Sequence, residues 1–336
     1  MLSFTILNED EFGSFVSNLQ TNNFLQSIYA YERYKKTSRE VYICGLRERE
    51  RIVCASIVLC THKRYGAKIF SLPGGPILDY NDKRRDEIMS NCSRELCSFL
   101  RKRGGIAVEI SPYIAYNDEL TKSLLELGYK ELGEYVQPKW VSVLDLTSFT
   151  NEEELLLSFR QSHRRSIRKA LKTYGVFLKE LSLAELPIFY ELVKKSSVKH
   201  GFSLQPLTYY EEMFRSFGEN IKFIVSYYDD IPLAGAMFVL YGDEIVYLYG
   251  GSDPKNGKYC GSFAIHWHML KFALENNYKY YNFYGVKPFP GDGVYEFKLG
   301  FRAGTREMMG TFILPIGLKG KLYKSRLKYK KYGNVF

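Results

Sequence analysis

The stretch Ile69-Phe-Ser-Leu-Pro-Gly-Gly75 returns in related form as Ile245-Val-Tyr-Leu-Tyr-Gly-Gly251. Both are apolar runs that end in paired glycines, a pattern typical of a strand followed by a turn. A β-rich run that starts with a short turn precedes each of them, at Arg51–Leu59 and at Asp230–Phe238. The recurrence of these two units in the same order indicates an internal duplication.

The two halves continue in parallel after the paired glycines. Each has an amphipathic helix, a strand, a short helical segment that ends in Leu-Gly-aromatic, and a closing strand. These segments are 84–102, 106–110, 125–129 and 141–146 in the first half, and 262–276, 280–284, 297–301 and 309–314 in the second. The alternation predicts two α/β (α+β) domains, which we place at residues 1–150 and 151–336. We expect Gly128 and Gly300 to form left-handed helix C-caps.

The overall composition is that of a globular protein. The 336 residues, 46% hydrophobic and 25% charged, are enough for two packed cores. No stretch approaches the ~20 apolar residues of a spanning helix, and the first residues lack the pattern of a signal peptide. The six cysteines contain no CxxC pair and the five histidines lack metal-site spacing. We therefore expect free, buried thiols, no metal and a cytoplasmic location.

Several segments of the second half carry a specific resemblance. Tyr281-Asn-Phe-Tyr-Gly285 is followed, after a glycine-containing loop, by Gly293-Val-Tyr-Glu-Phe-Lys-Leu-Gly-Phe301. Near the N-terminus, Phe24-Leu-Gln-Ser27 precedes Tyr31 and Lys35. Together these segments resemble the FemABX family, and the element order in each half resembles a GNAT-type acyltransferase domain. Long members of that family insert a coiled-coil arm, and the lack of sustained heptads here indicates the short form.

This resemblance implies an aminoacyltransferase. The implied reaction moves an amino acid from aminoacyl-tRNA to a primary amine on the stem peptide of a lipid-linked or UDP-linked peptidoglycan precursor, without a further cofactor. It implies a catalytic second domain and a substrate-binding, non-catalytic first domain. Because the donor is an activated ester, the enzyme mainly has to orient the amine and stabilise the charge that develops on the carbonyl oxygen.

The resemblance also implies site residues. Lys298 matches the family's lysine near the acyl-transfer centre, where a cation offsets developing charge, whereas the first half has Glu126 at the equivalent position. That difference favours a functional role for Lys298, because the structural motif does not itself require a lysine. Residues that match the family's substrate contacts are Phe297, Tyr209, Tyr249, and Lys35 or Lys36, the last two for a diphosphate. Gln205 stands where an arginine is expected beside that lysine, and it adds a hydrogen-bond donor without charge.

Basic residues predict contacts with anions. The net charge of +10 favours acidic partners. In a predicted helix over Phe159–Lys172, Arg160, Arg164, Arg168 and Lys172 share one face. We predict that Arg164, Arg165, Arg168 and Lys172 bind tRNA phosphates; a solvated face balanced by acids is the alternative. The tail is a second basic candidate, for tRNA or the inner membrane surface; it contains Lys319, Lys321, Lys324, Arg326, Lys328, Lys330 and Lys331.

Two other classes of function remain open from the sequence. Asn256-Gly-Lys-Tyr-Cys-Gly-Ser262 lies where a GNAT enzyme would bind the pyrophosphate of CoA at a helix N-terminus. The chain would then be an acyl-CoA-dependent N-acyltransferase acting on a sugar nucleotide or polysaccharide precursor. A non-catalytic binding protein is the third possibility, and the presence of Lys298 argues against it.

Overall fold

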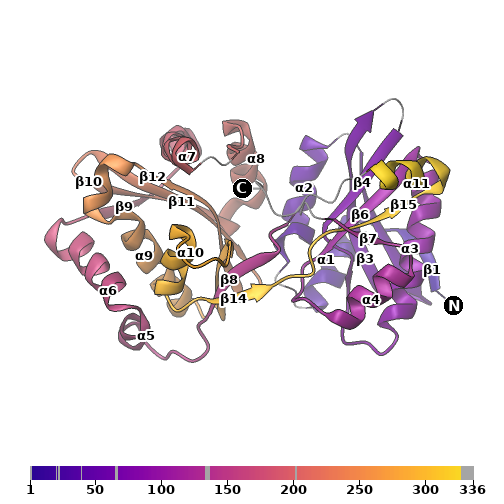
Figure 1. The fold of residues 1–336 in the computed structure, drawn as a ribbon, viewed down its shortest axis with the longest axis horizontal. Helices are drawn as coiled ribbons and strands as arrows, with labels where there is room; N and C mark the ends of the chain where they lie inside the picture. The colour runs from indigo at the N-terminus through magenta and orange to yellow at the C-terminus, as the bar shows by residue number, and fades with distance from the viewer. Residues whose placement is uncertain are drawn as a thin grey trace. The chain divides into compact units, whose positions relative to one another are not determined.

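The computed structural model describes residues 2–19, 21, 23–38, 40–64, 67–132, 137–200 and 203–326. The described residues form two compact units (Figure 1). One contains the described parts of Met1–Lys139 and Glu307–Gly333, and the other contains the described part of Trp140–Arg306. Each unit is a sheet covered by helices, so the predicted α/β class is confirmed.

The first unit is built on a mixed sheet with the strand order β1-β2-β3-β4-β6-β15-β7, and the short strand β5 pairs with β3. β1 to β4 pair antiparallel in succession, β4 and β6 are parallel, and β15 is antiparallel to β6. Its strands are β1 Leu2–Ile6, β2 Val41–Glu48, β3 Arg51–Arg64, β4 Ala67–Gly74, β5 Ile77–Leu78, β6 Gly105–Pro112, β7 Lys130–Glu131 and β15 Phe312–Pro315. Its α-helices are α1 Glu9–Asn18, α2 Ile28–Thr37, α3 Arg85–Arg101, α4 Asp118–Glu126 and α11 Gly317–Arg326.

The second unit has a sheet with the order β14-β8-β13-β12-β11-β10-β9, in which β12 and β13 are parallel. Helix α9 packs on one face, whereas α7 and α8 pack on the sheet from β10 to β12. Its strands are β8 Trp140–Asp145, β9 Phe177–Glu180, β10 Ile221–Tyr228, β11 Ile231–Tyr241, β12 Glu244–Ser252, β13 Tyr280–Gly285 and β14 Gly304–Glu307. Its α-helices are α5 Glu152–Ser158, α6 Gln161–Arg168, α7 Leu186–His200, α8 Leu207–Phe217, α9 Gly261–Glu275 and α10 Gly293–Gly300.

The closing strands of the two halves are exchanged. β8 closes the first half of the sequence but pairs with β13 in the second sheet, and β15 closes the second half but pairs with β6 in the first sheet. The compact units therefore do not follow the expected division at residue 150: the chain crosses after Lys139 and returns after Arg306. The equivalent positions of β8 and β15 beside β13 and β6 agree with the inferred duplication.

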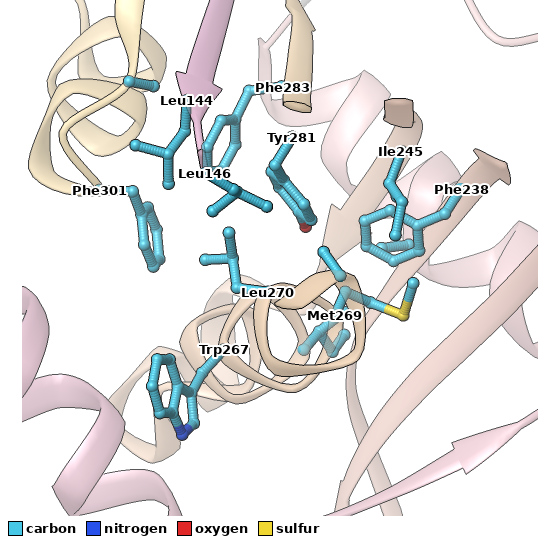
Figure 2. Close-up of a cluster of buried hydrophobic side chains, with 14 of the residues drawn as sticks. Leu144, Leu146, Phe238, Ile245, Trp267, Met269, Leu270, Tyr281, Phe283 and Phe301 are labelled. Atoms are coloured by element: carbon cyan, nitrogen blue, oxygen red, sulfur yellow. The ribbon is translucent and has the colours of Figure 1, made fainter. Parts of the chain in front are cut away.

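Each sheet has its own apolar core. In the second unit the core gathers large side chains from α9, from the sheet and from the end of α10 (Figure 2). Leu270 of α9, Tyr281 of β13 and Phe301 after α10 are each fully buried there. Leu144 of the exchanged strand β8 also lies in this core, so the exchange contributes apolar contacts as well as backbone pairing.

Some local expectations are corrected by the structure. Gly128 does adopt a left-handed backbone with φ +90°, but Gly300 does not, and the left-handed residue after α10 is Arg302 with φ +65°. The basic helix does not run from Phe159 to Lys172: α6 starts at Gln161, and a π-helical turn, Lys169–Thr173, follows it. The six cysteines are free, as predicted, although only Cys44 and Cys54 are fully buried.

Position 251 requires glycine because β12 packs closely on α7 there. A Cβ at this position would lie 2.5 Å from Cα of Val193 and would overlap the carbonyl oxygen of Leu192. Because backbone atoms cannot move aside cheaply, Gly251→Ala is expected to destabilise the second unit by about 1–3 kcal/mol. Urea unfolding followed by tryptophan fluorescence checks this, since Trp140 and Trp267 both lie in that unit. Gly257→Ala is the control, because its Cβ would meet nothing within 4 Å.

Candidate active site

The two parallel strands of the second sheet separate early. β12 pairs with β13 only from Glu244↔Tyr280 to Val246↔Asn282, and β12 then continues to Ser252 paired with β11 alone. In the first unit the equivalent strands β4 and β6 stay paired through Gly74↔Pro112. The second sheet thus leaves one edge of β12 without its β13 partner, a feature that β4 in the first unit does not have.

Hydrogen bonds of the Asn282 side chain hold β13 at the point where it separates from β12. The side-chain amide of Asn282 donates from Nδ2 to Oε1 of Glu244 at 3.1 Å, and its Oδ1 accepts the backbone N–H of Tyr284 at 2.7 Å. Tyr284 has a left-handed backbone, φ +60°, and the pairing of β13 with β8 shifts register between Asn282 and Gly285. Such a bulge turns the strand and redirects its carbonyl groups.

Lys298 lies against those carbonyls. It belongs to α10, whose first turn is capped by Asp292 accepting the N–H of Tyr295 at 2.8 Å. Lys298 is only 4% exposed, and its Nζ donates to the carbonyl oxygen of Gly285 and, at 3.5 Å, to that of Tyr284. Burial lowers the pKa of Lys298 to about 7, and the nearby Asp292 carboxylate opposes that shift. A buried lysine without an ion pair in the described residues is rare in a purely structural role.

A buried histidine and aromatic side chains lie near α10. His266 of α9 is buried and its Nδ1 lies 2.8 Å from the hydroxyl of Tyr281. Burial first, then the charges of Lys298 and His163, lower the pKa of His266 to about 3, so its imidazole is neutral near pH 7. The ring of Phe297 packs against His266 with centroids 5.4 Å apart. Phe297, which precedes Lys298 in the chain, is partly buried against the core of the second unit.

Helix α6 is packed directly onto α10. Nε2 of His163 lies 2.9 Å from the carbonyl oxygen of Phe297, which fixes Nε2 as the protonated nitrogen of a neutral ring. Burial is the main cause that lowers the pKa of His163. Gly300 makes room for this ring, because a Cβ there would overlap the imidazole. Sterics, not a left-handed backbone, therefore explain glycine at position 300.

The two copies differ at the lysine position as the sequence suggested. Glu126, the first-half equivalent of Lys298, is exposed to solvent at the end of α4. Lys298 is buried at the corresponding place on α10. The same backbone motif therefore accommodates an exposed carboxylate or a buried cation.

The rings of Tyr209 and Tyr249 lie next to each other. Their ring centroids are 5.8 Å apart, and both pack on buried Tyr210. A bulge in β12 produces this arrangement: Met237 faces Tyr249 while its neighbour Phe238 faces Tyr247, so the two β12 tyrosines point to opposite faces of the sheet. Gln205 is half-buried just before α8.

Lys35 and Lys36 belong to the first unit and are exposed at the end of α2. Nζ of Lys35 lies 2.8 Å from Glu9 and 2.6 Å from Glu32, and these carboxylates raise its pKa. A diphosphate would have to displace both carboxylates to bind Lys35. Lys35 is therefore less available to a diphosphate than the sequence suggested.

The basic residues of α6 and its π-helical turn fall into two groups. Arg160 forms an ion pair with Glu296 at 2.7 Å, and Arg164 donates to the carbonyl oxygen of Leu157 at 2.8 Å. Arg165, Arg168 and Lys172 are exposed, and none has an ion pair with any residue the structure describes. The π turn also removes Lys172 from the four-residue spacing that had placed it in line with Arg168.

The segment considered for a CoA pyrophosphate has a packing role. It forms a 3-10 helix, Pro254–Tyr259, and α9 then begins at Gly261. A Cβ on Gly261 would lie 2.5 Å from Oγ of Ser226 and 2.8 Å from Cβ of Leu233. Close approach to the sheet therefore accounts for this glycine without a ligand.

Lys319 and Lys321 are exposed on α11, whereas Lys328, Lys330 and Lys331 lie outside the described residues, as do the side chains of Lys324 and Arg326. In the part of the chain that the structure describes, no group of three or more His, Cys, Asp or Glu side chains is placed to hold a metal ion. None of the described helices combines the length and the apolarity needed to cross a bilayer.

Comparison with solved structures identifies the class. The chain is similar to FemX with a TM-score of 0.81 and 18% identity, covering 97% of this chain and 100% of that one. It is also similar to a tandem GNAT protein from the clavulanic acid biosynthesis pathway, with a TM-score of 0.60, 10% identity, and coverage of 94% and 99%. The chain therefore has the tandem GNAT-like fold.

Sequence comparison identifies the family. The FemAB family model matches residues 7–230 and 222–328, so this chain belongs to the FemAB family. It is 25% identical to "Aminoacyltransferase FemB" of Staphylococcus epidermidis, over 98% of this chain and all of the relative, and 24% identical to "Aminoacyltransferase FemA" of Staphylococcus aureus, over 94% and 96%. The FemB alignment spans 429 positions, more than this chain contains, so that relative has additional residues, as expected for a short form here.

Proposed function

We propose that this chain transfers an aminoacyl group from aminoacyl-tRNA to a primary amine of a peptidoglycan precursor, the step that builds an interpeptide bridge. The observation that carries the proposal is Lys298, buried at the point where β12 and β13 separate and present in only one of the two copies. Membership of the FemAB family, whose relatives FemA and FemB are aminoacyltransferases, supports the aminoacyl donor.

The chemistry assigned to Lys298 is electrostatic. The acceptor amine attacks the ester carbonyl carbon of the donor, a C–N bond forms, and the C–O bond to the ribose breaks. The amine loses a proton and the ribose oxygen gains one. The ammonium group of Lys298, oriented by the carbonyls of Gly285 and Tyr284, offsets the negative charge on the carbonyl oxygen. A donor aimed at such charge contributes about 3–4 kcal/mol to lowering the barrier.

Aromatic and polar side chains are assigned to the acceptor. Tyr209 and Tyr249, whose ring centroids lie 5.8 Å apart, are assigned to hydrogen bonds with a stem peptide, with Gln205 as an uncharged hydrogen-bond donor and Phe297 as an apolar contact. Lys35 or Lys36 is assigned to the diphosphate of a lipid-linked or UDP-linked precursor. No further cofactor is proposed. Cytoplasmic action, with the basic tail near the inner membrane surface, suits a lipid-linked acceptor.

The tRNA contact is assigned to the exposed cations of α6 and its π turn. No Asp or Glu occurs between residues 155 and 179, so no acid of this segment competes for Arg165, Arg168 or Lys172. Helix α6 also touches α10 through His163 and Phe297, which connects this basic surface to the helix that carries Lys298.

The triple variant Arg165→Ala/Arg168→Ala/Lys172→Ala is expected to weaken tRNA binding about 10-fold to 100-fold near 0.1 M salt, because three phosphate contacts are lost. The slope of log K against log salt should fall by about 2–3. Filter binding from 50 to 200 mM salt measures both quantities. Lys194→Ala is the control, since Lys194 is exposed but paired with Glu191. An unchanged salt slope in the triple variant would place the tRNA elsewhere.

A donor comparison tests the function itself. Purified protein is mixed with aminoacyl-tRNA or with acyl-CoA, each labelled in the acyl group, together with a peptidoglycan precursor extract, and label is followed into the acceptor. Transfer from tRNA to a precursor amine is expected. Transfer from acyl-CoA alone would refute the proposed donor and would support the alternative hypothesis that residues 256–262 bind the pyrophosphate of CoA.

A further inference from the structure

Buried polar contacts run continuously from Glu244 to Lys298. Glu244 is 5% exposed and Asn282 is 1% exposed, and the Asn282 side chain joins Glu244 on one side to the N–H of Tyr284 on the other. Asn282 is also the last β13 residue that pairs with β12. The residue at which the strands separate is therefore the residue that holds the following turn.

The turn at Tyr284 needs such support. A left-handed backbone at a non-glycine residue costs about 1–2 kcal/mol, and a buried amide bonded to its N–H offsets part of that cost by favouring the turn. The turn sets the directions of the carbonyls of Tyr284 and Gly285, and both accept from Nζ of Lys298. If the turn relaxes, the ammonium group loses the acceptors that orient it.

We propose that Asn282, held in place by Glu244, is a positioning residue for Lys298: it fixes the left-handed turn at Tyr284 and thereby the two carbonyl groups that orient the ammonium group. Asn282 does not itself contact the reacting atoms in this scheme. The kinetic consequence rests on the proposed role of Lys298 in aminoacyl transfer, whereas the structural consequence does not.

The first test is independent of activity. The protein is labelled with lysine that carries 13C at Cε. The resonance of Lys298 is the one that is absent from the spectrum of Lys298→Met. The pKa of Lys298 is then measured by NMR titration. Asn282→Ala is expected to lower the pKa of Lys298 by about 0.5–1 unit, because hydrogen bonds to the charged form are lost. Asn276→Ala should leave it unchanged, since Asn276 is exposed at the end of α9 and its side-chain amide donates to the Phe272 carbonyl.

The second test exchanges the amide and the carboxylate between positions 282 and 244. Asn282→Asp places a second carboxylate against Glu244 and is expected to lower kcat about 10-fold to 100-fold, with KM for both substrates changed less than about 3-fold. Adding Glu244→Gln restores an amide facing a carboxylate and leaves an oxygen for the Tyr284 N–H. The double variant should therefore recover most of kcat.

Two outcomes overturn the inference. One is a Lys298 pKa that is the same in Asn282→Ala and the wild type; the other is a double variant no more active than Asn282→Asp although its melting curve matches the wild type. A wild-type protein that transfers nothing from aminoacyl-tRNA refutes the proposed function instead, and the NMR titration then still decides whether Asn282 positions Lys298.

Discussion

Lys298→Met is expected to lower the rate of aminoacyl transfer by about 10²–10³-fold while leaving the second unit at least as stable as in the wild type at pH 7. The loss of rate follows from removal of the cation. The stability follows from burial, which lowers the pKa of Lys298 from 10.5 to about 7. Between these values the unfolded chain binds more protons than the folded one, so wild-type stability rises as the pH rises from about 7 to 10.5.

Methionine has a similar length and no charge to desolvate. After subtracting the loss of the hydrogen bonds to two carbonyls, we expect the free energy of unfolding of Lys298→Met to exceed that of the wild type by about 1–3 kcal/mol at pH 7. This difference in stability should shrink toward pH 10. Urea unfolding at pH 6, 7 and 9 and single-turnover transfer assays measure the two effects. Lys287→Met, at an exposed lysine before α10, is the control. A variant that is less stable at every pH, with activity lost in proportion, would make Lys298 a structural residue.

Gly300→Ala is expected to destabilise the second unit by about 3 kcal/mol and to reduce transfer, because the added methyl group would overlap His163. The imidazole has little freedom to move. It is bonded to the Phe297 carbonyl, and its centroid lies 5.0 Å from the ring of Phe263 and 4.8 Å from that of Phe301. The better helix propensity of alanine, about 1 kcal/mol, does not compensate.

A second substitution separates this clash from other effects. His163→Ala removes the ring that the methyl group meets, so His163→Ala/Gly300→Ala should be more stable than Gly300→Ala alone. Gly293→Ala, in the first turn of the same helix, is the control because its Cβ would meet nothing within 4 Å. If the double variant is no more stable than Gly300→Ala, the overlap with His163 is not the reason for glycine at position 300.

Sequence reasoning succeeded where a pattern is local. Helix α9 and strand β13 begin within one residue of the expected segments at 262 and 280, and the contrast between Lys298 and Glu126 was visible because duplication supplies an internal comparison. Strand β9, only Phe177–Glu180, was not predicted. Four mostly exposed residues carry too little hydrophobic alternation to be recognised without their partner β10.

What the sequence could not supply are relations between distant residues. Asn282 stood inside the quoted motif, but nothing near Glu244 signals that it would bond to Asn282. Similarly, Gly300 suited a C-cap by position, and only the packing of α6 shows that His163 requires it. The exchange of β8 and β15 is of the same kind, because periodicity predicts that a strand exists and does not identify the sheet it joins.

That exchange also governs how the protein is made. On the ribosome, the first sheet stays incomplete until β15 emerges, although all its other strands lie before Lys139. At ~5–20 residues per second the nascent chain waits roughly 10–30 s with the edge of β6 unpaired. A stop codon anywhere before Phe312 therefore damages the N-terminal unit as well, and truncated products should be held by chaperones or degraded as whole chains instead of accumulating as a folded first half.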